Sequence, residues 1–112
     1  MQMEDEIRNL ISSTLNITEC KPSQTLSIPC FIFDYNYLEN GNVYGNGKCE
    51  YSDHYVQIDL YYLKENDFKN ARKLLKDALK DKYVYPTIDS YFDTTNKFYR
   101  ATFQFVVQER EV

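Results

Sequence analysis

Hydrophobic and polar side chains alternate along residues 55–62, the most regular stretch of the chain. Val56, Ile58, Leu60 and Tyr62 alternate with Tyr55, Gln57, Asp59 and Tyr61. Because successive side chains of a strand point to opposite faces, this pattern predicts a strand with one buried face and one face toward water or a partner. A polar run over residues 64–67 ends the strand.

The next part of the chain carries apolar residues at helical spacing. They are Phe68, Ala71, Leu74, Leu75, Ala78 and Leu79. At about 100° per residue they fall within an arc of roughly 140°, which suits packing on a sheet. We expect Asn66 or Asp67 to cap the first turn. We expect the helix to end near residues 82–84, because Pro86 disfavours helical geometry at the residue before it.

A second helix is predicted over residues 3–15. Its apolar positions repeat at spacings of three and four: Met3, Ile7, Leu10, Ile11 and Leu15. The acidic residues Glu4, Asp5 and Glu6 occupy its first turn, where they interact favourably with the positive end of the helix dipole. Residues 16–29 are interpreted as a connector.

The middle of the chain is less regular. An apolar run predicts a short strand over residues 30–33 that continues at most to Tyr35. Residues 36–52 hold all three glycines, inside strong turn signals, and predict a protruding hairpin or a long loop.

The C-terminal part predicts a β-hairpin. Residues 87–93 and 98–107 read as strands, and the turn over residues 94–97 joins them antiparallel. Residues 108–112 form a charged tail that is expected to fray.

Together these elements predict one α+β domain over residues 1–112, in the order α-β-β-α-β-β. A mainly antiparallel sheet with both helices packed on one face buries every apolar face.

Composition and charge limit the classes of partner that the protein can bind. The net charge of −4 argues against electrostatic capture of nucleic acid or of an acidic membrane. No apolar run approaches the roughly 20 residues that span a bilayer. The first residues lack the basic start and apolar core of a signal peptide, so we expect the protein to be cytoplasmic at synthesis. Tyrosine is abundant, at 11 residues, and favours partly wet positions such as protein interfaces.

The cysteines and the single histidine are the candidates for metal binding or acid–base chemistry. The three cysteines contain no CxxC pair, and in the cytoplasm their default state is the free thiol, with Cys30 as a small buried hydrophobe. His54 lies beside Asp53 and follows Cys49 with the spacing Cys-x4-His. Structural zinc normally takes four ligands, and Asp53 and His54 point to opposite faces of an extended chain. We interpret His54 as a polar residue at a loop end.

Two acidic residues, Asp89 and Asp93, flank Tyr91 on one strand face. Paired carboxylates bind cations or carry acid–base chemistry, but no third acidic partner is in register, which favours a solvated face. The chain also lacks a glycine-rich phosphate loop and a recognisable nucleophile motif. We therefore predict no catalytic residue, no cofactor and no metal.

A stripe of lysines follows the second helix: Lys69, Lys73, Lys76 and Lys80. A solvated helix face is the simpler interpretation. If the stripe binds a partner, an acidic patch on another protein suits the net charge better than DNA does.

Three runs of sequence, together with the order of the elements, point to a known family. They are Tyr51-Ser52-Asp53-His54-Tyr55-Val56-Gln57-Ile58-Asp59-Leu60-Tyr61-Tyr62, then Ala71-x2-Leu74-Leu75-x2-Ala78-Leu79, then Tyr91-Phe92-Asp93-Thr94-Thr95-Asn96-Lys97-Phe98-Tyr99-Arg100-Ala101-Thr102-Phe103. The chain resembles the tail terminator, or tail completion, proteins of tailed-phage and prophage necks, over most of residues 3–107.

The resemblance implies an α-β-β-α-β-β subunit that assembles, usually as a hexameric ring, at the end of the tail tube. It implies that the ring stops tube growth and offers a docking face to the head connector. The implied partners are copies of the chain, the tail tube and head-connector proteins. The implied locations are the bacterial host cytoplasm during assembly and the virion neck afterwards. No catalysis and no cofactor are implied.

A ring requires two different patches of one subunit to meet. We therefore predict that the loop at residues 36–52, or the outer face of residues 55–62, docks on the next subunit, with the lysine stripe and the acidic positions Asp34, Glu39 or Glu50 as two such patches. The predicted interface residues are Tyr44, Tyr55, Tyr61, Lys69, Lys73 and Lys76.

A different class of protein also fits the residues. A small acidic binding protein, such as a bacterial immunity protein that masks a toxin, is the alternative. Such a protein is typically monomeric or dimeric, so ring formation separates the two hypotheses. An enzyme is the third and weakest.

Overall fold

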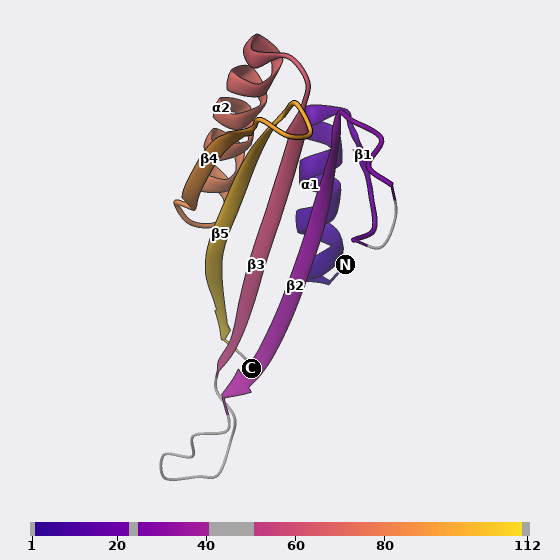
Figure 1. Ribbon diagram of the computed structural model, residues 1–112. Helices are drawn as coiled ribbons and strands as arrows, with labels where there is room; N and C mark the ends of the chain where they lie inside the picture. Colours follow the sequence, from indigo (N-terminus) through magenta and orange to yellow (C-terminus); the bar gives the residue numbers. More distant parts are fainter. Residues whose placement is uncertain (1, 23–24, 41–50, 111–112) are drawn as a thin grey trace, which may run out of the picture.

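The computed structural model describes residues 2–22, 25–40 and 51–110. These residues form α1 (Met3–Leu15), β1 (Thr18–Glu19), β2 (Cys30–Asn40), β3 (Tyr51–Tyr62), α2 (Glu65–Lys82), β4 (Thr87–Asp93) and β5 (Phe98–Arg110). The predicted α+β class is confirmed, as Figure 1 shows.

The strands form one sheet in the order β1-β2-β3-β5-β4. Neighbouring strands run antiparallel, except that β1 pairs parallel with β2. β3 lies in the middle and pairs along its whole length with β5, from Tyr51↔Arg110 to Tyr62↔Tyr99. The alternation seen in residues 55–62 is therefore that of the central strand.

Several strand boundaries differ from the prediction. β2 runs on to Asn40 and β3 begins at Tyr51, so residues 36–40 and 51–52, expected in a loop, belong to strands. β1 lies inside the predicted connector, and β5 extends into the tail that was expected to fray. In each case pairing with a neighbouring strand satisfies backbone groups whose own side chains give only a weak strand signal. The remaining part of the predicted hairpin, residues 41–50, lies outside the described residues.

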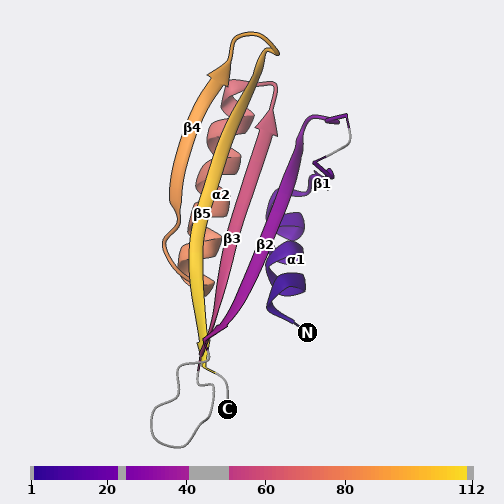
Figure 2. The same ribbon diagram turned by 60° about the horizontal axis from the view of Figure 1, so that its bottom comes forward.

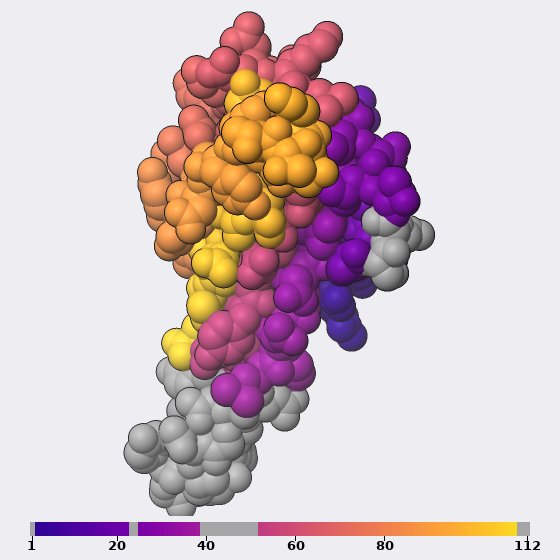
Figure 3. Space-filling view, viewed as in Figure 1, coloured from indigo at the N-terminus to yellow at the C-terminus, as the bar shows by residue number. Residues whose placement is uncertain are grey.

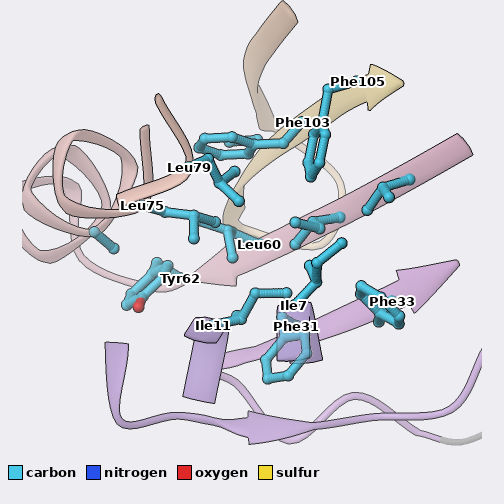
Figure 4. Packing of buried hydrophobic residues seen from close by; sticks show 14 of the residues in the cluster. Ile7, Ile11, Phe31, Phe33, Leu60, Tyr62, Leu75, Leu79, Phe103 and Phe105 are labelled. Atoms are coloured by element: carbon cyan, nitrogen blue, oxygen red, sulfur yellow. The ribbon is translucent and has the colours of Figure 1, made fainter. Parts of the chain in front are cut away.

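Both helices lie on the same face of the sheet, as predicted (Figures 1 and 2). Figure 4 shows side chains from both helices and from β2, β3 and β5 pointing toward one another: Ile7, Ile11, Phe31, Leu60, Leu75, Leu79 and Phe103. All of these are fully buried. Full burial of such a side chain stabilises by about 1.5–3 kcal/mol, so this layer is the main core.

The buried stripe of α2 is narrower than the predicted arc. Leu75 and Leu79 are fully buried, but Leu74 is 53% exposed. Leu74 precedes Leu75 by about 100° around the helix, which is enough to turn it away from the sheet. Including Leu74 in the core was therefore wrong.

The start of α2 also differs from the prediction. The helix begins at Glu65, with Lys64 at the N-cap position and no capping hydrogen bond from its side chain. Asn66 and Asp67 already belong to the first turn, so the predicted cap was wrong. Acidic side chains at Glu65 and Asp67 instead favour this end through the helix dipole.

The segment before β2 covers part of the other face of the sheet. Cys20, Cys30 and Tyr61 form a second buried cluster, against which Leu26, Ile28, Ile32 and Phe98 pack. Cys30 is fully buried, which confirms its interpretation as a small buried hydrophobe. Figure 3 views the molecule from the side opposite the helices and shows this segment beside the sheet, near the β4–β5 turn.

Candidate functional site

A polar network crosses the sheet face that is turned away from the helices. Thr102 Oγ1 donates a hydrogen bond of 2.6 Å to Asp59 Oδ1, and Arg100 Nη2 lies 3.3 Å from the same oxygen. Arg100 Nη1 donates in turn to the hydroxyl of Tyr91, at 2.8 Å. The network links β3, β5 and β4 and fixes the positions of these side chains.

Tyr55 lies further along the same face and is 43% exposed. Its neighbour on β5 is Val106, which is 45% exposed. Both line a shallow hollow of about 580 Å³ that also includes Tyr85, Gln57 and Gln104. Tyr55 is therefore available to a partner, as its predicted interface role requires.

Tyr61 is on this face too, but it is only 6% exposed. It packs with Cys20 and Cys30, and the ring of Phe98 meets it edge-on with 5.2 Å between ring centroids. The prediction placed Tyr61 correctly on the face away from the helices. Its burial removes it from the surface that a partner can touch in this conformation.

The predicted lysines lie along a groove between α2 and β4. Lys69, Lys73 and Lys76 line it together with Arg72, which the prediction did not include. Arg72 Nη1 donates to Ser90 Oγ on β4, at 3.0 Å. In the described part of the chain no acidic residue lines this groove, so it is a basic surface on a protein of net charge −4.

One lysine of the groove has an ion-pair partner on its own helix. Lys69 Nζ lies 3.0 Å from Glu65 Oε1, and both side chains are more than half exposed. Such pairs contribute about 0–1 kcal/mol, so Lys69 gains little from Glu65. The lysines thus remain available for an acidic partner.

Of the other predicted contact positions outside the lysine stripe, the structure describes the side chain of Asp34 alone. Asp34 is exposed on β2, on the sheet face turned away from the helices, which we call the uncovered face, whereas the basic groove lies beside β4 at the other edge of the sheet. Tyr44, Glu50 and the side chain of Glu39 lie outside the described residues.

His54 is not at a loop end, contrary to the prediction. It lies within β3, is 5% exposed, and faces the same side as Val56. Its Nδ1 is hydrogen-bonded to the hydroxyl of Tyr35, and its Nε2 lies 3.1 Å from Ser52 Oγ. Asp53 points to the opposite face, as predicted, and accepts a hydrogen bond of 3.3 Å from Gln108.

The Ser52–His54 pair has the elements of a nucleophile and a base, but Ser52 is fully buried. A hydroxyl without solvent access cannot meet an external substrate. Both ring nitrogens of His54 already have hydroxyl partners, which is how a buried polar side chain is normally satisfied. The arrangement joins β2 and β3 and serves the fold. The period-two pattern of residues 54–60 was the signal that could have placed His54 inside.

Asp93 and Asp89 do not form a paired carboxylate site. Asp93 Oδ1 accepts hydrogen bonds from the backbone N–H groups of Thr95 and Asn96, both at 3.0 Å, and Oδ2 accepts one from the Asn96 side chain. The bonds from Asn96 are the main reason that the pKa of Asp93 is lowered. Asp93 therefore fixes the β4–β5 turn, while Asp89 is simply exposed.

No group of three or more His, Cys, Asp or Glu side chains within the described ranges is arranged to hold a metal ion. Neither α1 nor α2 is long and apolar enough to cross a membrane. No protein-family model matches the chain, and no curated protein matches it.

Proposed function

We propose that the protein is a structural, non-enzymatic subunit of a phage or prophage neck, of the tail terminator (tail completion) type. In this proposal it forms a ring at the end of the tail tube and joins the tail to the head. The sequence resemblance over most of residues 3–107 supports it. The described fold also contains the element order α-β-β-α-β-β that the resemblance implies, with β1 as an addition.

The observation that carries the proposal is the sheet face left without helices. Tyr55, Tyr91 and Val106 each expose more than two fifths of their surface there. Tyrosine offers a large contact area at low entropic cost, which is why protein interfaces use it. A ring subunit must contact two neighbouring subunits as well as tube and head proteins, and this face supplies area for such contacts.

The distribution of charge supports a contact between unlike patches. The groove beside β4 is basic, and the first turn of α1 carries Glu4, Asp5 and Glu6. Patches of opposite sign on one subunit suit the heterologous contact from which rings are built.

The alternative is a small acidic binding protein such as a bacterial immunity protein. The net charge of −4 favours it, because an acidic surface suits a basic toxin. It predicts a monomer or dimer with no affinity for tail tubes.

Electron microscopy of tail tubes tests the proposed function. Purified phage tail tubes are mixed with the tagged protein, and the tag is labelled with gold. We expect gold at tube ends and not along tube walls, and tubes whose further growth is stopped.

Two variants sharpen this experiment. Tyr55→Ala combined with Tyr91→Ala should reduce end labelling if the uncovered face is used. Leu74→Ala removes an exposed apolar side chain from the helix layer and is the matched control. Unlabelled ends with the unaltered protein would refute the proposed function.

A further inference from the structure

We propose that neighbouring copies of this chain join edge to edge, with β4 of one copy pairing antiparallel with β2 of the next. This inference rests on the proposed ring and names the surfaces that close it. β4 is the last strand of the sheet. β1 pairs only with Cys30 and Phe31, so in the described residues β2 has no strand partner on its outer side from Ile32 onward. Unpaired strand edges are templates for pairing with another chain.

The strand directions fit such a joint. β2 is antiparallel to β3, β3 to β5, and β5 to β4, so β4 runs opposite to β2. Figure 2 shows β4 on one side of the four long strands and β2 on the other. Two copies placed side by side, with their helices on the same face, therefore continue the antiparallel sheet. The same placement sets α2 of one copy beside α1 of the next.

The short strand β1 sets the smallest shift that this pairing allows. Within one copy, Thr87 lies on the same rung as Gln104, Gln57 and Asp34. Continuing these rungs into a neighbour would set β4 against Cys30 and Phe31, where β1 already pairs. The pairing avoids β1 when Thr87 lies opposite Leu38 of the neighbour instead of Asp34. This is a shift of four residues. An even shift keeps every side chain on its own face.

In this register the side chains at the joint match. Thr87 lies opposite Leu38 of the next copy, and Asp93 lies opposite Ile32. On the helix side, Phe92 meets Phe33 and Ile88 meets Tyr37. Phe92 is 41% exposed and Tyr37 is 50% exposed in the single chain. Aromatic and β-branched cross-strand pairs are favourable, so the joint covers apolar surface that the single copy leaves in water.

The backbone of β2 is oriented for this pairing. The backbone N–H of Cys20 donates to the carbonyl of Phe31 at 2.8 Å, so the backbone groups of Phe31 face outward. Because these groups alternate sides along a strand, Phe33, Tyr35 and Tyr37 also turn theirs to the outer edge. A neighbouring strand would satisfy them.

The same register places the acidic start of α1 of one copy beside the basic groove at α2 of its neighbour. Lys82 Nζ lies 3.8 Å from Glu6 Oε1, so within one copy the start of α1 is level with the end of α2. A shift of four strand residues is about 13 Å, which equals roughly nine residues of helix. It moves the start of the neighbour's α1 from the level of Lys82 to that of Lys73 and Lys76. Acidic residues then face the basic groove.

The acidic residues concerned lie on the outer side of α1. Glu4 and Asp5 contact Arg8 at 3.9 and 3.8 Å, and Arg8 Nε lies 2.7 Å from Glu19 of β1. This side of α1 therefore points toward the β1 edge of the sheet, whereas Glu6 faces α2 of its own copy. The stagger also tilts the strands, which closing a sheet into a ring requires.

Engineered disulfides test the register. Asp89 is expected opposite Asn36 of the next copy, and both are exposed on the uncovered face. The variant Asp89→Cys with Asn36→Cys, in a Cys49→Ser background, should form disulfide-linked multimers under mild oxidation. Asp89→Cys with Asp34→Cys, displaced by two residues, is the matched control and should link at least about tenfold less, because bonding needs Cα atoms within about 7 Å.

Charge exchange tests the helix contact independently. Lys73→Glu with Lys76→Glu should weaken association by about fivefold or more, as removal of close interfacial charge pairs does. Adding Glu4→Lys and Asp5→Lys to the same chain should restore it at unchanged net charge. Circular dichroism on every variant verifies that the fold is retained.

The outcomes test the edge-to-edge joint and the neck function separately. Cross-linking of Asp89→Cys to Asn36→Cys, with the protein alone at high concentration or in rings on tube ends, supports the joint. Rings on tube ends without that cross-link and without charge rescue overturn the joint and leave the neck function standing. Cross-linked multimers that never bind tubes support the joint and contradict the neck function. A strict monomer overturns the joint.

Discussion

Arg100 Nη2 lies 3.3 Å from Asp59 Oδ1, on the diagonal of the β3–β5 ladder, while Thr102 stands directly opposite Asp59 and donates to it. Asp59 is 7% exposed, so its carboxylate is largely desolvated and depends on these donors. Burial lowers the pKa of Arg100, but the charge of Asp59 and the bond to Tyr91 outweigh it and leave that pKa raised. The centre of the uncovered face is therefore polar and preorganised.

The bond between Asp59 and Thr102 should appear as an energetic coupling. A double-mutant cycle with Asp59→Asn and Thr102→Val, followed by urea unfolding, is expected to give a coupling of about 1 kcal/mol, because each partner is partly buried and serves the other. Additive effects, within about 0.3 kcal/mol, would show that the two side chains are independently solvated.

Leu75 and Leu74 form a matched pair for testing the helix layer. Leu75→Ala should lower the free energy of unfolding by about 2–5 kcal/mol, because it empties a fully buried site. Leu74→Ala should change it by no more than about 0.5 kcal/mol, because Leu74 is 53% exposed. Denaturant unfolding of both variants measures the difference. Equal losses would mean that α2 packs through another face.

Asp93 should make the hairpin turn sensitive to acid. Hydrogen bonds from Asn96 are the main cause of its lowered pKa in the folded protein. Its contribution to stability is therefore present above the pKa of an unfolded Asp, about 3.9, and is lost as the pH falls through the lower folded value. Asp93→Asn should destabilise at pH 7, and this loss should shrink as the pH falls through the folded pKa of Asp93.

The matched control for that experiment is Asp89→Asn, an exposed position on the same strand. Its effect on the unfolding free energy should be small at both pH values. An Asp93 carboxyl that titrates at or above the value of an unfolded Asp in an NMR pH series would contradict the turn described above.

The thiol of Cys30 should be inert in the native protein. Burial, with a smaller contribution from Cys20, raises its pKa to about 12, so at pH 8 it stays protonated and unreactive. In a Cys49→Ser background, modification by a thiol reagent at pH 8 should be slow in buffer and complete in denaturant. Rapid modification without denaturant, located at Cys30 by peptide mapping, would show that the segment before β2 does not cover Cys30.

Much of the fold follows from periodicity in the sequence. The bounds of the helix at residues 3–15 and of the strand at residues 87–93 are confirmed. The helix has a clear apolar period, and the strand lies between Pro86 and the turn over residues 94–97. The face of each side chain at residues 55–62 of β3 also follows from alternation alone. The main core could thus be predicted, apart from Leu74.

The features that the sequence did not predict depend on contacts between residues far apart in the chain. Residues 36–40 carry polar side chains next to strong turn signals, and only pairing with β3 makes them a strand. Tyr61 and Tyr55 have the same local sequence pattern. The segment before β2 covers Tyr61 but leaves Tyr55 exposed. Arg72 lies three residues after Lys69 and four before Lys76, so helical spacing could have placed it in the basic groove. Only its hydrogen bond to Ser90 on β4 depends on a contact between distant residues.

The predicted interface residues differ in whether a partner can reach their side chains. Tyr55, Lys69, Lys73 and Lys76 lie on accessible surface, Tyr61 does not, and Tyr44 is outside the described residues. The hypothesis that the outer face of residues 55–62 docks on a neighbour is thus restricted to its Tyr55 end. The edge joint between β4 and β2 leaves that end free for tube or head proteins.

Sedimentation velocity over a concentration series, with and without tail tubes, tests the neck function most directly. The proposed function predicts a shift from monomer toward one closed multimer as concentration rises, and co-sedimentation with tubes that saturates at the number of tube ends. A protein that stays strictly monomeric and never binds tubes, at any concentration or salt, would contradict it and favour the small acidic binding protein.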